Sequence, residues 1–274
     1  MRVTNQMMST TYLKDLNKNL NNLNTLNKQL TTGKEISKPS DNPFKTARIM
    51  QMYSDISANK QYNENIKDTI NWLDTTDVAL EQIGNSAQRI RELMVSAGNA
   101  SYGSDEKNAL KEEINEKINE IAQVLNTNYD GKYIFGGTKS LSKPVGVEKD
   151  SNGNNILVFK DDNGNSFNEE GKAYIKNADG TITRDANGNL AVEANPKPEY
   201  EKLLNQMNAN LSVEVSNGVN MNYNVGTPSI LTLKNGNNVM KLLNDVVNNL
   251  DKVDSSDVIK GNLEEMDLFV SNVS

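Results

Sequence analysis

The sequence predicts a mostly α-helical protein with an inserted β domain, arranged as an elongated antiparallel helical bundle that carries a β-rich tip domain. Three observations lead to this fold class. Apolar residues recur with a helical period near both ends of the chain. From residue 138 to 232, short apolar runs alternate with Gly-containing turn dipeptides. The composition, 36% hydrophobic but only 5% aromatic with a mean hydropathy of −0.65, favours thin bundles over one thick core.

The composition also argues against several classes of function. A net charge of −7 over 274 residues, without clustered Lys and Arg, argues against nucleic acid as a partner. Cysteine and histidine are both absent, which removes thiol nucleophiles, the usual zinc ligands and imidazole bases. We therefore expect no enzymatic activity, no cofactor and no metal centre.

The N-terminal residues contain no apolar core of the kind that a cleaved signal peptide needs. No run approaches the roughly 18 apolar residues that identify a membrane-spanning helix. We expect a protein without a membrane partner that, if secreted, leaves the cell without losing a leader.

The first domain, residues 1–43, is predicted to be one helix followed by a corner. Leucines recur with the three- and four-residue spacing of a bundle seam. The other faces carry few i,i+4 ion pairs, so this helix should need a partner helix. The stripe consists of Leu13, Leu16, Leu20, Leu23, Leu26 and Leu30.

The corner contains residues that end one helix and begin another. Gly33 can adopt the positive φ that terminates a helix, and Pro39 cannot donate a hydrogen bond to a continuing one. Ser40 or Asp41 is expected to cap the next helix, with Pro43 in its first turn.

The second domain, residues 44–137, is predicted to be a helical rod with a closing strand. Its long helix, to about Ala97, has a stripe that we expect to be mostly intramolecular core, and Trp72 is interpreted as a packing residue. The stripe contains Ile66, Leu73, Leu80, Ala87 and Met94, flanked by Ile70, Ile83 and Ile90.

A second helix of this rod is expected to start with Ser104 as its cap, and residues 132–137 should form the strand. Its apolar stripe is Leu110, Ile114, Ile118, Ile121 and Leu125. Glu112, Glu113, Glu116 and Glu120 could form an acid–base pair or a metal site, but without a nearby histidine a solvated face is favoured.

The third domain, residues 138–232, is the β-rich insert. Its Asn-Gly and Asp-Gly dipeptides predict hairpins with type I′ turns. The string Asp-x-Asn-Gly-Asn starts at Asp150, Asp161 and Asp185 and invites a calcium interpretation. The Gly and Glu positions of an EF-hand are not matched, so repeated turns are favoured; a calcium- or glycan-binding module stays an alternative.

The fourth domain, residues 233–274, is predicted to contain two helices that return to the rod. The first carries Val239, Leu242, Val246 and Leu250. After a cap at Ser255 or Ser256, the second carries Ile259, Leu263, Met266, Val270 and Val273.

Several motifs, in this order, resemble the flagellin superfamily. They are the start Met1-Arg2-Val3-Thr4, the corner from Thr32 to Pro43, the stretch Gln88 to Leu93, and the run from Tyr129 to Thr138. The resemblance covers residues 1 to about 137 and resumes weakly from Asn235.

Within the superfamily, Pro39 to Pro43 and Asn126 to Tyr129 resemble the hook-filament junction family more than filament flagellins. This resemblance implies a structural component of the bacterial flagellum: a ring of subunits between a hook-associated protein and flagellin. It also implies extracellular location, flagellar type III export and an export chaperone. Filament flagellin or a minor flagellin is the alternative. Family members continue with a further C-terminal helix, which this sequence is expected to lack.

The candidate functional residues are therefore those of assembly and packing, with no catalytic, cofactor or metal residues among them. The assembly and packing set is Leu13, Leu16, Leu20, Leu23, Leu30, Ile66, Ile70, Leu73 and Leu80. The corner set is Gly33, Pro39, Asp41 and Pro43. We expect the leucines of the first helix to be the better candidates for contacts between subunits.

Overall fold

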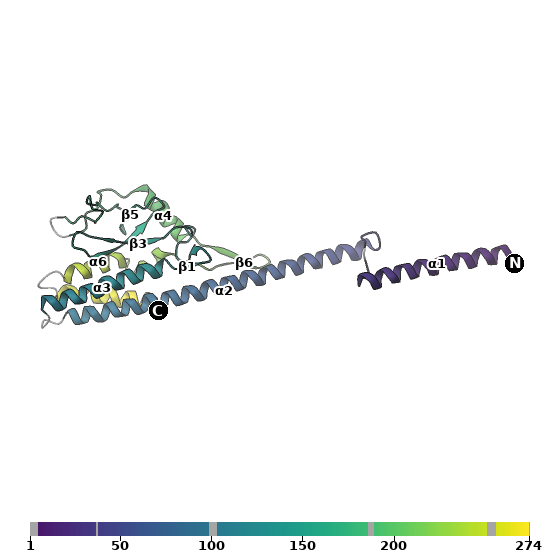
Figure 1. Cartoon of the computed structure of the whole chain (residues 1–274), viewed down its shortest axis with the longest axis horizontal. Helices are drawn as coiled ribbons and strands as arrows, with labels where there is room; N and C mark the ends of the chain where they lie inside the picture. Colours follow the sequence, from purple (N-terminus) through teal and green to yellow (C-terminus); the bar gives the residue numbers. More distant parts are fainter. Residues whose placement is uncertain (1–4, 37, 99–102, 186–188, 251–255, 274) are drawn as a thin grey trace. The chain divides into compact units, whose positions relative to one another are not determined.

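The structure is a computed structural model that describes residues 5–36, 38–98, 103–185, 189–250 and 256–273. It contains two compact units, Met1–Glu64 and Asn65–Ser274, so the division lies inside the long helix α2 (Pro43–Ala97). The protein is mostly α-helical with small antiparallel sheets, as the sequence predicts (Figure 1). The four predicted domain boundaries stay a prediction.

The first unit consists of α1 (Asn5–Thr32), the corner and the beginning of α2. Gly33 has a φ of +63° directly after α1, which confirms that this glycine ends the helix. No residue that the structure describes in this unit is buried. The described residues of this unit thus form no hydrophobic core of their own.

The cap of α2 differs from the prediction. Asn42 Oδ1 accepts the backbone N–H of Lys45 at 3.1 Å, which makes Asn42 the N-cap in place of Ser40 or Asp41. The reason is that Pro43 is the first helical residue, so the cap position falls on its immediate neighbour. Asp41 instead holds the corner, because its Oδ2 accepts the N–H of Lys38 at 3.0 Å.

The second unit packs the C-terminal part of α2 with α3 (Ser104–Leu125), α6 (Val239–Leu250) and α7 (Ser256–Val273). Gly103, not Ser104, is the N-cap of α3, since Ser104 is already helical. The predicted stripes of α3 and α6 are confirmed as core. Their fully or almost fully buried members are Ile114, Ile118, Ile121, Leu125, Val239, Leu242, Val246 and Leu250. The cap expected at Ser255 falls outside the described residues.

A three-stranded antiparallel sheet covers α3 and α6. Its order is β3 (Val145–Lys149), β4 (Asn155–Lys160) and β5 (Ser166–Phe167). Figure 1 shows α3 and α6 between this sheet and α2, and both helices contact β4. The insert therefore shares one core with the helices.

The central strand β4 explains this arrangement because it is buried on both faces. Leu157 and Phe159 belong to the main core, while Ile156 and Val158 form a second cluster with Tyr174 and Ile182. A continuous apolar run of this kind needs a cover on each side of the sheet. The helices supply one cover and the following loops of the insert supply the other.

The insert also contains elements that differ from the prediction. Helix α4 (Pro198–Asn208) buries Tyr200, Leu203 and Met207, and α5 (Thr227–Leu231) follows the hairpin of β6 (Ser212–Ser216) and β7 (Val219–Asn222). The spacing of the three buried residues of α4 is helical, but turn residues dominate the segment around them. The strand expected at residues 132–137 is shorter: β1 (Asn128–Tyr129) pairs with β2 (Lys132–Tyr133).

The hairpins of the insert are confirmed, but the turn type is not. Gly153 donates to Asp150 O at 3.1 Å, and Asp150 N–H donates to Asn154 O at 3.0 Å. This is a type I turn followed by a glycine bulge, and it needs positive φ only at the glycine, here +83°. Among the described residues, Asp130 is the only non-glycine with positive φ, so the type I′ pattern occurs at Asp130-Gly131 between β1 and β2.

The acidic strings form these turns themselves. Asp150 Oδ1 accepts the backbone N–H groups of Asn152 and Asn154, at 2.9 and 2.7 Å. Asp161 repeats the pattern with Asn163 and Asn165 at 2.9 and 2.8 Å. These carboxylate oxygens are used by the backbone of their own turn, which favours the turn interpretation over calcium.

The turns that start at Asp150 and Asp161 differ in one hydrogen-bond partner. Substitutions of these two residues can therefore be compared directly in an unfolding measurement. Asp150 Oδ2 also accepts Arg184 Nε at 2.7 Å, and both side chains are more than nine-tenths buried. Asp150→Ala should lower the free energy of unfolding by about 3–5 kcal/mol, because the buried guanidinium loses its carboxylate. Asp161→Ala, in an exposed turn, should cost about 1 kcal/mol. Urea unfolding followed by circular dichroism measures both, and equal losses would contradict this account.

Candidate functional site

The leucine stripe of α1 lies on the surface. Its exposed fractions run from 45% at Leu16 to 82% at Leu30, and α1 buries no residue among those described. Each large apolar side chain in water costs free energy that burial would recover, roughly 1.5–3 kcal/mol per fully buried side chain. The complete stripe is Leu13, Leu16, Leu20, Leu23, Leu26 and Leu30.

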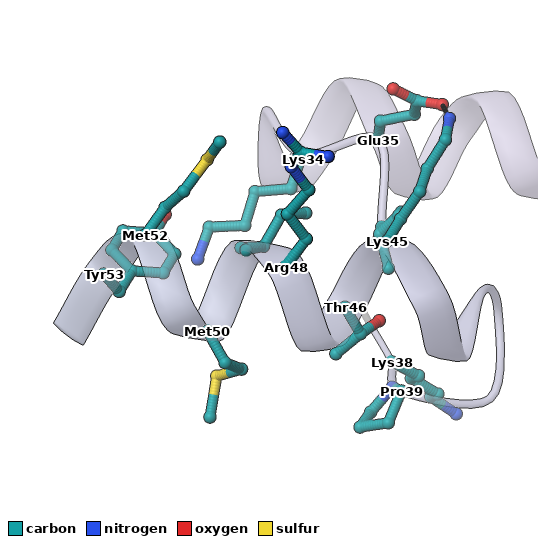
Figure 2. A pocket seen from close by; sticks show the side chains of 12 residues that line it. Lys34, Glu35, Lys38, Pro39, Lys45, Thr46, Arg48, Met50, Met52 and Tyr53 are labelled. Atoms are coloured by element: carbon teal, nitrogen blue, oxygen red, sulfur yellow. Dashed lines mark hydrogen bonds and ion pairs between the residues drawn. The ribbon is translucent and has the colours of Figure 1, made fainter. Parts of the chain in front are cut away.

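The apolar surface continues on the beginning of α2. Phe44 is 91% exposed, and the corner encloses a hollow of about 640 Å³. Fifteen of the 23 exposed large apolar side chains of the described residues lie between Met7 and Ile56. Concentrations of exposed apolar side chains of this kind are typical of interaction surfaces. The hollow is lined in part by Ile36, Pro39, Ile49, Met50, Met52 and Tyr53 (Figure 2).

Basic side chains surround the corner hollow. Figure 2 shows Lys45 reaching Glu35, at 2.8 Å, while Lys34, Lys38 and Arg48 lie along the same hollow. The hydrogen bond from Lys45 lowers the pKa of Glu35 below its ordinary value. The corner therefore combines apolar contact area with an excess of positive charge.

The positive charge at the corner is part of an uneven distribution of charge along the whole chain. Residues 1–64 contain nine Lys and Arg against five Asp and Glu, a net charge of +4. Residues 65–274 contain 20 Lys and Arg against 31 Asp and Glu, a net charge of −11. Opposite charges on two parts of one chain favour pairing between copies of that chain.

The stripe predicted for the long helix is core toward the C-terminal end, where Ile83, Ala87, Ile90 and Met94 are buried, but it lies mostly outside the core between residues 66 and 80. Ile70 and Leu73 are 51% and 41% exposed, and Ile66 and Leu80 are partly exposed. The prediction that this stripe is mostly intramolecular core is therefore wrong for Ile70 and Leu73. Between residues 65 and 80 the inward positions are instead filled by three small or polar residues and one tryptophan, which a search for large aliphatic residues misses. They are Thr69, Trp72, Thr76 and Ala79. An assembly role for the exposed stripe stays a prediction.

Charged side chains of α2 and α3 hold helices together. Arg89 Nε donates to Glu113 on α3 at 2.7 Å, and this hydrogen bond raises the pKa of Arg89. Arg91 donates to Asp267 on α7. Glu120 pairs with Lys117 at 2.7 Å. Among the residues that the structure describes, no group of three or more acidic residues could hold a metal ion.

Within the described ranges, no helix has the length and apolar character needed to cross a bilayer. The exposed leucines of α1 are interleaved with Asn, Lys and Thr, which makes this helix amphipathic.

Comparison with known proteins decides the family. The model of the bacterial flagellin N-terminal helical region matches residues 3–140, which is half of the chain. The chain belongs to this family. The exposed stripe, the corner and the helix pair of α2 and α3 all lie inside the matched residues.

Curated flagellins match the same part. Flagellin of Salmonella paratyphi A is 29% identical over 145 residues, which are 53% of this chain and 29% of that protein. Phase 1 flagellin of Salmonella naestved is 29% identical over 134 residues, 48% of this chain and 26% of its own length. The match therefore spans less than a third of either flagellin.

Solved structures share the fold over most of the chain. A protein of Vibrio parahaemolyticus described as a flagellar hook-associated protein is 18% identical with a TM-score of 0.59, covering 86% of this chain and 84% of that one. FlgL of Bacillus cereus is 18% identical with a TM-score of 0.51, covering 83% and 85%. At 18% sequence identity, this similarity shows only that the fold is shared.

The exposure of the leucine stripe leads to a stability prediction. Leu16→Ala and Leu20→Ala should each change the free energy of unfolding by less than about 0.5 kcal/mol, because their side chains are already in water. Ile118→Ala, at a fully buried position of α3, should cost about 2–5 kcal/mol. Chemical denaturation of the three variants measures this; a loss above about 2 kcal/mol for either leucine would show that the stripe is buried within the chain.

Proposed function

We propose that this protein is a structural component of the bacterial flagellum, a hook-filament junction protein that joins a hook-associated ring to the flagellin filament. The observation that carries the proposal is the first unit, which displays a leucine stripe yet buries none of its described residues. A surface of this kind acquires its core only when other chains cover it.

Membership of the flagellin family and the fold shared with the hook-associated protein of Vibrio parahaemolyticus support the same role. The role is mechanical: subunits assemble into a ring, contact a hook-associated protein on one side and flagellin on the other, and transmit torque. It needs no catalysis, cofactor or metal.

The same proposal places the protein outside the cell, in the flagellum. It would travel unfolded through the flagellar type III export channel, accompanied inside the cell by an export chaperone, and without a cleaved signal peptide. A chain without cysteine suits this route, because no disulfide can form before the chain is threaded.

Deletion of the gene in the source bacterium tests the junction role against that of a filament flagellin. A junction protein is expected to leave hooks without filaments, with flagellin shed into the medium and motility lost. Negative-stain microscopy and an immunoblot of the medium measure the outcome. Loss of the main filament protein itself, with no other flagellin shed, would instead assign the chain to the filament.

A calcium- or glycan-binding insert is the second alternative from the sequence. The turn carboxylates of Asp150 and Asp161 already accept three hydrogen bonds each from their own turns. We therefore expect no heat on calorimetric titration of the full chain with calcium chloride or with soluble oligosaccharides. Saturable heat with calcium would reverse this view of the insert.

A further inference from the structure

A groove in the second unit lies at the edge of the core and is lined by aromatic and charged side chains. It has a volume of about 570 Å³ and lies where α2, the β1–β2 hairpin and the β6–β7 hairpin meet. Trp72, Tyr129 and Tyr223 line it together with Asp68 and Asp130. The volume is that of a typical site for a small group or a long side chain.

The three aromatic rings form one cluster. The ring centroids of Trp72 and Tyr129 are 6.0 Å apart at 80°, and those of Trp72 and Tyr223 are 5.5 Å apart at 89°. Both arrangements are edge-to-face, so the tyrosines are held in place by a tryptophan that is only 6% exposed. Tyr129 and Tyr223 are half-buried and present aromatic surface to the groove.

The two carboxylates of the groove are available. Asp68 and Asp130 are exposed, and within the described part of the chain neither side chain takes part in a hydrogen bond or an ion pair. Lys132 also lines the groove but forms no ion pair with a described acid, so the lining keeps a net charge of −1. Aromatic surface beside uncompensated carboxylates is a site for an organic cation, by cation–π attraction and ion pairing.

The same chain presents cations of matching chemistry at its corner. Lys34, Lys38 and Arg48 lie along the corner hollow, and none of them pairs with an acid among the described residues. Arg48 fits the groove best, because a planar guanidinium stacks on aromatic rings and binds carboxylates with two parallel hydrogen bonds. The net charges of +4 for residues 1–64 and −11 for residues 65–274 favour the same encounter.

We propose that the groove receives Arg48 from a second copy of this chain, with Asp68 and Asp130 binding the guanidinium and Tyr129 and Tyr223 covering its plane. When each copy uses its corner toward one neighbour and its groove toward the other neighbour, the contact is heterologous, and such contacts repeat into rings or filaments. This inference rests on the proposed function and names a contact that holds neighbouring subunits. Lys34 and Lys38 then lie at the rim, where they strengthen long-range attraction.

Because the chain contains no cysteine, disulfide trapping tests this contact without background. Met50→Cys on the corner hollow is mixed with Lys132→Cys on the groove, in the full chain and under mild oxidation. The mixed disulfide should exceed by about fivefold or more that of Met50→Cys with Glu112→Cys, an exposed site on α3. It should fall steeply between 50 and 500 mM salt, since the screening length shortens from roughly 14 to 4 Å.

Charge variants decide whether the groove acids carry the contact. Asp68→Asn with Asp130→Asn on the groove partner should reduce trapping to the control level, whereas Glu199→Gln with Glu201→Gln, two exposed acids of α4, should leave it unchanged. Arg48→Glu on the corner partner should abolish trapping, and Asp68→Arg with Asp130→Arg should restore it. Rescue by charge exchange excludes misfolding as the cause.

Trapping that stays at the control level, or that survives loss of both groove acids, would overturn the proposal. Inhibition of trapping by added methyl glycosides, with no effect of Arg48→Glu, would overturn it as well and assign the groove to a saccharide. The deletion phenotype is independent of these outcomes. A junction phenotype without trapping removes only this contact, and trapping without that phenotype removes only the junction role.

Discussion

The fold depends on one hydrophobic core to which α2 and α3 both contribute isoleucines. Ile83 and Ile90 of α2 are fully buried, as are Ile114, Ile118 and Ile121 of α3. Residues of α6, α7 and the sheet belong to the same continuous core. Arg89 pairs with Glu113 of α3 and Arg91 with Asp267 of α7, both at the partly exposed edge of this core, so the apolar side chains supply most of the stabilisation.

The extent of this core divides the molecule into two parts whose surfaces differ in composition. Where α2 has partners, its inward face is closed and its outward face is acidic. Toward its N-terminal end no described residue is buried, and apolar and basic side chains dominate. A single continuous helix of 55 residues thus contributes both to a finished core and to a surface that has none. Helix propensity cannot distinguish the part of α2 that joins the core from the part that does not. Apolar residues recur with the helical period in both parts.

Much of the architecture could be predicted from periodicity. The isoleucines of α3 and the valines and leucines of α6 recur at helical spacing, and a stripe of that regularity is typical of a helix with one buried face. The inward face of α2 between residues 65 and 80 could not be predicted, because threonine and alanine are buried there while the larger Ile70 and Leu73 are exposed. The place of the insert could not be predicted either, since the double burial of β4 depends on contacts far apart in sequence.

The candidate functional surface, too, could be predicted only in part from the sequence. The leucine stripe and Gly33 follow from local rules, but the capping role of Asn42 depended on which residue stood directly before Pro43. The aromatic groove had no local signal, since Trp72, Tyr129 and Tyr223 come from three distant segments. Such a site becomes visible only when the hairpins are placed on the helix.

The glycine-bulge turns of the insert have a consequence for how quickly it forms. At Asp150, Asp161, Asn168 and Asn177, each turn closes between a residue and the fourth one after it. Loops this short lose little chain entropy on closure and form rapidly. A polypeptide that folds from an extended state therefore has several independent starting points for β structure. It could recover this region before the slow, long-range pairing of α2 with the C-terminal helices is complete.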